Sequence, residues 1–186
     1  ALAFGIGATE VAHVLATQTI WQKKPRRMRI RVEGRLGPAG GAQDNAPAWI
    51  ARLGADGARG HAVEYDGPVV RNLSMEGRLT LCNLSIEGGA RLGMIAPDET
   101  TFSYVRGRPF APSGSDWDRA VECWSRLAGD PDATFDREVS IDADAIAPIV
   151  TWGTSPEEAI PVDRTIPDPA QLEEGKARQA QSSLDY

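Results

Sequence analysis

The sequence has 186 residues, of which 41% are apolar and 25% charged, a composition typical of a soluble globular protein with one or two domains. Its 20 lysines and arginines stand against 26 acidic residues, and the net charge of −6 argues against a broad nucleic-acid-binding surface. No run approaches the roughly 18 apolar residues of a membrane span, and the first residues lack the basic segment of a signal peptide.

The first quarter of the chain predicts a helix, a strand and a second helix. Residues 9–21 place apolar side chains at helical spacing, and Thr9 is a candidate cap. KKPRR at 23–27 interrupts this pattern with a proline. MRIRVEGRL at 28–36 alternates apolar and charged residues, which predicts a half-buried strand, and a further helix is expected over 44–54.

The middle of the chain alternates between strand and helix patterns. HAVEYDG at 61–67 reads as a short strand that ends at an Asp-Gly turn. Residues 68–88 predict one or two helices, with Gly77 as the candidate break. RLGMIAPD at 91–98 is an apolar run bounded by glycine and proline, which indicates a buried strand.

The last elements continue this alternation and then fade. Residues 98–108 predict a helix capped by Asp98, and residues 115–130 predict the clearest helix of the chain. The apolar stripe of that helix consists of Trp117, Ala120, Val121, Trp124 and Leu127. FDREVSIDA at 135–143 reads as a strand, and residues 171–186 form only a weak helical pattern. Helices alternating with strands predict an α/β fold with a mixed or parallel sheet covered by helices.

Three short motifs have modest functional content. GIGATE at 5–10 is similar to part of a dinucleotide-binding fingerprint, but it lacks the third glycine and leaves hardly any room for a preceding strand. We interpret it as a glycine at the start of a helix. KKPRR could bind phosphate or an acidic partner, although a solvated linker is the favoured interpretation. His13 and His61 are interpreted as hydrogen-bonded structural residues, and no metal site is expected.

The two cysteines, Cys82 and Cys123, do not form a disulfide framework or a CxxC pair. This usage suits a reducing cytoplasm. We interpret both thiols as small buried hydrophobic groups, with a redox-sensitive Cys123 beside Trp124 as the alternative.

Asn83 and Glu87 stand out in LTLCNLSIEGGARLGMIAP, residues 79–97, because the surrounding helix is otherwise apolar. At i,i+4 spacing the amide and the carboxylate point the same way. Apolar residues cover most of the helix circumference, so we expect the helix to be deeply packed, where an unpartnered carboxylate costs several kcal/mol. Spacing alone leaves two interpretations open, a structural amide–carboxylate pair or a functional site.

The stretch SMEGRLTLCNLSIEGGARLGMIAPDETTFSYVRGRPFAP, residues 74–112, resembles the large subunits of bacterial 3-isopropylmalate dehydratases, a branch of the aconitase family. FGIGATEVAHVLATQT, RIRVEGRLGP, GADGARGHAVEYDG and VTWGTSPEEAIPV are similar in the same order. The resemblance covers the whole chain, and motifs this long and consecutive are highly specific.

This resemblance implies a hydro-lyase of leucine biosynthesis that interconverts 2- and 3-isopropylmalate by removing and re-adding water. It implies a [4Fe–4S] cluster in the complete enzyme, a small-subunit partner that carries the catalytic serine, and a small dicarboxylic hydroxy-acid substrate. The family's Asn and Glu fall on Asn83 and Glu87, with Asn83 near the cluster and Glu87 at the hydroxyl or water on the open iron. Neither cysteine matches a cluster ligand, so we expect these 186 residues alone to be inactive.

The resemblance also implies a division of the chain within an aconitase-like three-layer αβα arrangement. Residues 1–24 are expected to end a first domain, residues 25–147 to form a complete second domain, and residues 148–186 to begin a poorly anchored third. Two alternatives stay open: a sister hydro-lyase acting on homoaconitate or on a methylmalate or citraconate, and a non-catalytic α/β assembly module.

Overall fold

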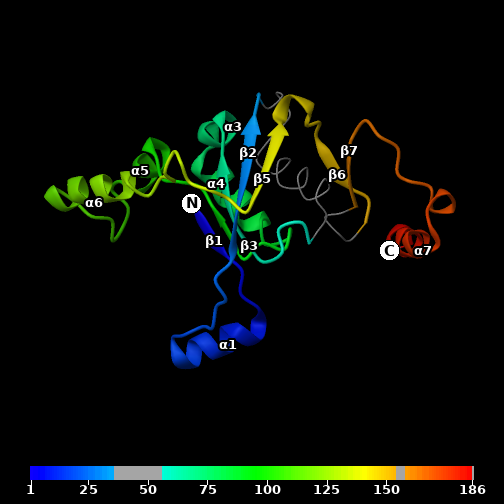
Figure 1. Ribbon diagram of the computed structural model, residues 1–186, viewed down its shortest axis with the longest axis horizontal. Helices are drawn as coiled ribbons and strands as arrows, with labels where there is room; N and C mark the ends of the chain where they lie inside the picture. Colours follow the sequence, from blue (N-terminus) through cyan, green and yellow to red (C-terminus); the bar gives the residue numbers. More distant parts are fainter. Residues whose placement is uncertain (36–55, 154–157, 186) are drawn as a thin grey trace.

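The structure is a computed structural model that describes residues 1–35, 56–153 and 158–185. Its centre is a five-stranded sheet in the order β1-β4-β3-β2-β5 (Figure 1). The bounds of these strands are Leu2–Phe4 for β1, Arg26–Glu33 for β2, His61–Asp66 for β3, Leu92–Met94 for β4 and Arg137–Asp142 for β5. Strands β4, β3, β2 and β5 run parallel, and β1 pairs antiparallel with β4. The predicted α/β class with a mixed sheet is confirmed.

Strand β2 lies between two neighbours, and its alternating sequence separates the two faces of the sheet. Ile30 lies opposite Tyr65 on one side and Val139 on the other, while Arg29 lies opposite Glu64 and Glu138. The apolar face is closed to solvent and forms the core, whose sheet residues include Met28, Ile30, Val32, Val63, Tyr65 and Ile141. The predicted half-buried strand is confirmed, because successive side chains in a strand point to opposite faces.

The opposite face of the same strands is polar and carries ion pairs between neighbouring strands. Arg29 pairs with Glu138 at 2.7 Å and Arg31 with Asp66 at 2.9 Å. The guanidinium of Arg29 also lies 4.6 Å from the ring centre of Phe135. Cross-strand pairs of this kind stabilise a sheet modestly, so the apolar face supplies most of the driving force.

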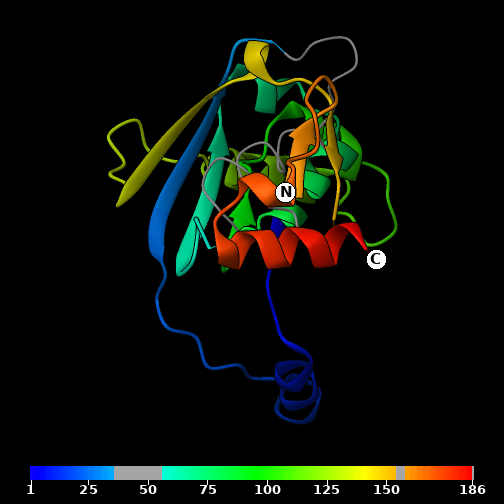
Figure 2. The ribbon, with the colours of Figure 1, turned by 90° about the vertical axis from the view of Figure 1, so that its right-hand side faces the viewer.

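Two helices lie between β3 and β4 in the sequence, and both pack on the sheet (Figure 2). Helix α3 (Pro68–Asn72) packs on β2 and β3, and helix α4 (Met75–Leu84) packs on β1 and β4. The prediction of one or two helices is confirmed, but the break lies at Leu73 and Ser74 instead of Gly77. Leu73 is extended, and the hydroxyl of Ser74 accepts a hydrogen bond from Gly77 N at 3.2 Å as the cap of α4. Gly77 therefore lies in the first turn of α4, because the hydrogen bond from the Ser74 cap stabilises the helix start more than the glycine destabilises it.

Helix α5 (Glu99–Val105) begins at Asp98, whose carboxylate accepts hydrogen bonds from Thr100 N and Thr101 N at 3.1 and 3.3 Å. This confirms the predicted cap. Helix α6 (Ser115–Ser125) confirms the clearest predicted helix, but only Trp117 of its apolar stripe is buried. Leu127 lies beyond the end of the helix and is 63% exposed.

Helix α1 (Ala8–Thr17) stands apart from the sheet in both views and buries none of its residues (Figures 1 and 2). Thr9 was expected to cap it, but the cap is Gly7, whose N–H donates to Glu10 Oε2 at 2.8 Å. The cap thus lies two positions earlier than expected, where the Glu10 carboxylate reaches back to the N–H of Gly7 as in a capping box, and the helix ends at Thr17, four residues before the predicted end.

The expectation that there is hardly room for a strand before GIGATE is wrong, since β1 occupies Leu2–Phe4. Residues 44–54, where a helix is expected, lie outside the described ranges. After β5 come the short helix η1 (Ala143–Ala145), a two-stranded antiparallel sheet of β6 (Ile149–Thr151) and β7 (Ala159–Pro161), η3 (Pro169–Gln171) and helix α7 (Glu174–Leu184). The domain boundaries at 24/25 and 147/148 stay predictions.

Candidate functional site

Asn83 and Glu87 lie where helix α4 ends and the chain turns towards β4. The α-helix stops at Leu84, four residues earlier than expected. Tighter turns follow, in which Ile86 N donates to Asn83 O and Glu87 N to Leu84 O, both at 3.2 Å. Hydrogen bonds between residues i and i+3 commonly end a helix, and here they are followed by Gly88 and Gly89. Asn83 thus lies in the last turn of α4, and Glu87 lies in the tighter turn that follows it.

Both side chains are exposed, which corrects the expectation that they lie in a deeply packed helix. The buried side of α4 is formed by other residues, namely Met75, Arg78, Leu81 and Cys82. Leu79 on the same helix is 41% exposed, so an apolar residue does not mark a buried flank here. The carboxylate of Glu87 therefore has no burial penalty to offset within this part of the chain.

Ser85, between the two candidates, fastens the turn to the core. Its hydroxyl is buried, donates to Leu81 O at 3.0 Å and is 2.8 Å from Tyr65 Oη on β3. A Cβ on Gly93 would lie 2.4 Å from Ser85 Oγ, so only glycine fits at that position of β4. Sequence reasoning missed this pair, although a serine within an otherwise apolar helix was a usable signal.

Further backbone contacts fix the same turn from two other segments. Ala58 N donates to Gly88 O at 3.0 Å, which ties the turn to the loop before β3. A Cβ on Gly5, just after β1, would lie 2.9 Å from Ile86 Cγ2. The interpretation of GIGATE as a helix-start motif is confirmed at Gly7, and Gly5 adds a close approach to the candidate turn.

The arrangement presents an amide and a carboxylate to the outside on a rigid backbone. Among the residues that the structure describes, neither Asn83 nor Glu87 has a side-chain hydrogen-bond partner. An amide offers both donors and an acceptor, and an ionised carboxylate accepts up to four hydrogen bonds. The turn could thus hold a hydroxyl or water of a ligand, with other groups needed to complete an enclosed site.

The cysteines do not fit a metal cluster. Cys82 is fully buried under α4, and burial raises the pKa of its thiol to about 11. Cys123 lies on α6 and is exposed, so the interpretation of both thiols as buried is wrong for Cys123. Within the described ranges no three His, Cys, Asp or Glu side chains come together in a way that could hold a metal ion.

The two histidines differ from one another. His61 is buried and its Nδ1 lies 3.0 Å from Arg59 O, which confirms a structural role. His13 is exposed on α1 with no side-chain partner in the part of the chain that is described, so the expectation of a hydrogen-bonded residue is wrong there. The packing of α1 explains the difference, because this helix buries none of its side chains.

Two comparisons relate the chain to known proteins. The model of the aconitase family (aconitate hydratase) matches residues 1–186. The "3-isopropylmalate dehydratase large subunit 1" of Bradyrhizobium diazoefficiens is 54% identical over 187 residues. That match includes 100% of this chain and 39% of the relative, so the chain spans about two fifths of the length of this curated relative. Among the described helices, none combines the length and the apolar character that crossing a bilayer requires.

Proposed function

Because the chain belongs to the aconitase family, we propose that it forms part of the large subunit of a 3-isopropylmalate dehydratase. This hydro-lyase would interconvert 2- and 3-isopropylmalate by removing and re-adding water. The observation that carries the proposal is the 54% identity to a large subunit of that name along the entire chain. The name of the relative also supports a small subunit as the partner.

Within that enzyme, Asn83 and Glu87 would form one wall of the active site. Their exposure supports this role, since a catalytic wall must face the substrate while its backbone is held still. The contacts of Ser85 with Tyr65 and Leu81 supply that rigidity from the buried side. The carboxylate of Glu87 would exchange a proton with the substrate hydroxyl, and the amide of Asn83 would donate to a substrate oxygen.

The [4Fe–4S] cluster that the family implies would draw its cysteine ligands from elsewhere in the complete enzyme. The sequence contains only Cys82 and Cys123, and neither fits, as one is buried under α4 and the other lies on α6. We therefore propose that the 186 residues contribute side chains to the reaction without holding the cluster. A cytoplasmic location is supported by the two unpaired thiols.

A sister hydro-lyase is the alternative substrate assignment, and turnover by the complete two-subunit enzyme separates the two. We expect kcat/KM for 2-isopropylmalate to exceed that for homoaconitate, citraconate and methylmalate by about tenfold or more, as one or two alkyl contacts allow. A higher kcat/KM for one of the other diacids would assign that diacid as the substrate. Absence of turnover with all of them would favour a non-catalytic assembly module. The observation that favours the assembly module is that neither Cys82 nor Cys123 fits a cluster ligand.

A further inference from the structure

A second region of the molecule concentrates positive charge, although the whole chain carries a net charge of −6. It is a pocket of about 860 Å³ at the edge of the sheet where the parallel strands begin. Its cationic side chains outnumber its two carboxylates three to one, and they are Lys23, Lys24, Arg26, Arg59, Arg91 and Arg137. Neither Asn83 nor Glu87 lines this pocket, although the hydrogen bond from Ala58 N to Gly88 O places the candidate turn beside the loop that forms its rim.

The topology of the sheet gathers these charges from distant parts of the sequence. Arg26 opens β2 and His61 opens β3, and the two residues are paired across the parallel strands. Arg137 opens β5 on the other side of β2. Parallel strands start at the same edge of a sheet, so basic residues at their first positions meet there. The segment KKPRR, for which a solvated linker was the favoured interpretation, supplies Lys23, Lys24 and Arg26.

Only some of these cations are neutralised by a carboxylate. Arg59 pairs with Asp56 at 2.6 Å and Arg91 with Glu10 at 3.1 Å. Arg26 donates to Arg59 O at 3.4 Å and Arg137 to Gly57 O at 2.6 Å, and neither guanidinium has a carboxylate within ion-pair distance among the described residues. A carbonyl accepts a hydrogen bond but carries no net charge to balance the cation.

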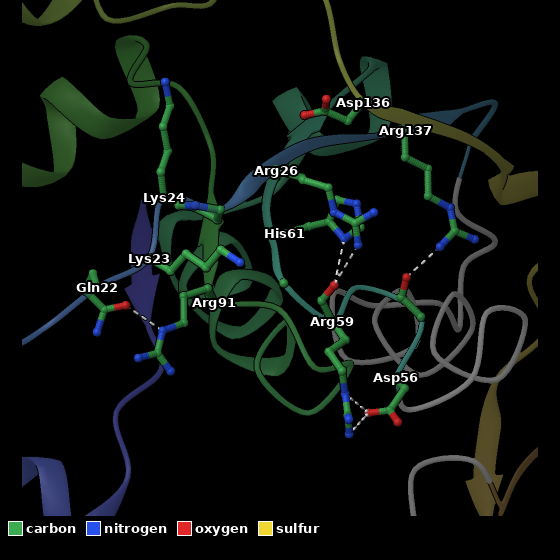
Figure 3. A pocket seen from close by; sticks show the side chains of 13 residues that line it. Gln22, Lys23, Lys24, Arg26, Asp56, Arg59, His61, Arg91, Asp136 and Arg137 are labelled. Carbon is green, nitrogen blue, oxygen red and sulfur yellow. Dashed lines mark hydrogen bonds and ion pairs between the residues drawn. The ribbon is translucent and has the colours of Figure 1, made fainter.

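The two lysines have no carboxylate within ion-pair distance among the described residues. Figure 3 shows the side chain of Lys23 extending towards Arg26 and His61, whereas Lys24 points away from them. Lys23, Arg26 and Arg137 are therefore the charges available to a ligand in the pocket.

The carboxylate of Asp136 at the rim is already engaged. Asp136 Oδ2 accepts a hydrogen bond from Arg27 N at 2.7 Å. This hydrogen bond, with the nearby charges of Arg27 and Arg26, holds the pKa of Asp136 below its usual range. Asp136 is therefore ionised at neutral pH and offsets part of the positive charge at the rim, where the cations still outnumber the carboxylates three to one.

We propose that this pocket binds a small molecule that carries at least two phosphate groups. Guanidinium forks and an ammonium group are the side chains that recognise phosphate oxygens, through charge-assisted hydrogen bonds. The volume lies within the range of small-molecule sites and exceeds what one phosphate fills. The cations line one concave site and the chain is acidic overall, which disfavours a nucleic-acid surface.

Isothermal titration of the complete protein with inorganic pyrophosphate at low salt tests the proposal. We expect saturable binding that weakens as salt is raised, since the site is open to solvent. The double variant Lys23→Gln/Arg26→Gln should weaken binding by about tenfold or more, because it removes charge-assisted hydrogen bonds to the ligand. The control Arg119→Gln/Arg126→Gln removes the same charge from α6 and from the residue that follows it, where both side chains are exposed, and should bind as the unmodified protein does.

Three outcomes would overturn the proposal. One is the absence of binding up to about 1 mM pyrophosphate, the weak end of specific affinities. Another is an equal loss in the control, which would indicate diffuse charge instead of a site. The third is tighter binding of citrate or of a short single-stranded DNA than of pyrophosphate, which would assign the pocket to another ligand class. The melting temperature of each variant shows whether lost binding reflects lost contacts or unfolding. If the double variant is unstable, Lys23→Gln alone gives the same test, because it breaks no contact in the described structure.

Discussion

The guanidinium of Arg78 is fully buried and forms a two-point ion pair with Asp98, with Nη1–Oδ1 at 2.5 Å and Nη2–Oδ2 at 2.7 Å. Arg78 also donates to Leu73 O and Arg71 O at 3.2 and 2.7 Å. One arginine therefore joins the end of α3, the body of α4 and the first residue before α5. Buried polar groups need hydrogen-bond partners, and each of the three guanidinium nitrogens donates to at least one of these.

Replacing Asp98 with alanine should destabilise the protein strongly. The change leaves a buried guanidinium without its counter-ion and removes the cap of α5, so we expect a loss of about 3–5 kcal/mol in the free energy of unfolding. Asp116→Ala is the matched control, because Asp116 pairs with Arg119 on the exposed side of α6 and should cost under about 1 kcal/mol. Equal losses in urea unfolding of the two variants would contradict the structural role of the Arg78–Asp98 pair.

The same pair predicts a pH dependence of stability. Partial burial acts to raise the pKa of Asp98, but the hydrogen bonds and charge of Arg78, with the N–H groups of Thr101 and Thr100, outweigh it and lower the pKa. A carboxyl with a lowered folded pKa contributes its full stability above its unfolded pKa, about 3.9, and loses it as the pH falls through the folded pKa. Unfolding free energies between about pH 2 and 6 should fall less steeply towards acid in Asp98→Asn than in the unmodified protein. Parallel curves would refute this assignment.

Glu87→Gln in the complete two-subunit enzyme tests the proposed catalytic wall. If Glu87 exchanges a proton with the substrate hydroxyl, kcat should fall by about 10²–10⁴-fold while the unfolding free energy changes by under about 0.5 kcal/mol, since the side chain is exposed. Glu76→Gln, an exposed carboxylate in the first turn of the same helix, should retain its activity. Unchanged kcat in Glu87→Gln would remove this residue from the reaction.

The two thiols should react at very different rates in the native protein. Cys123 is exposed, whereas Cys82 is buried and its pKa is raised to about 11, so little thiolate forms at pH 8. Alkylation followed by peptide mass spectrometry should modify Cys123 within minutes, and Cys82 only after denaturant is added. Rapid native labelling of Cys82 would show that α4 does not cover it in solution.

Local patterns predicted the parallel strands and the Asp98 cap because both depend on neighbouring residues. The alternation around Met28 and Ile30 fixes which face is buried, whatever else the chain does. The break before Ser74 was misplaced to Gly77 because the hydroxyl cap outweighs the low helix propensity of glycine. Burial was misjudged at Cys123 for a different reason, since only tertiary packing decides which flank of a helix is covered.

The sequence located the residues of the candidate site, but it predicted neither their exposure nor the contacts that support them. Asn83 and Glu87 do lie on successive turns, yet they lie outside the core, and the support from Tyr65 to Ser85 spans 20 residues. Contacts at that separation carry no local signature. The cationic pocket is similar, since Arg26 and Arg137 come together only through the order of the strands.

The antiparallel edge strand has a consequence for how the protein is made. Leu2 lies opposite Met94, so β1 cannot form this pairing until β4 has been synthesised about ninety residues later. During translation the parallel strands β2 and β3 are available to each other before β4, the partner of β1, has been synthesised. The pairing of β1 with β4 is therefore a contact of high sequence separation, which is expected to form after β2 and β3 have paired.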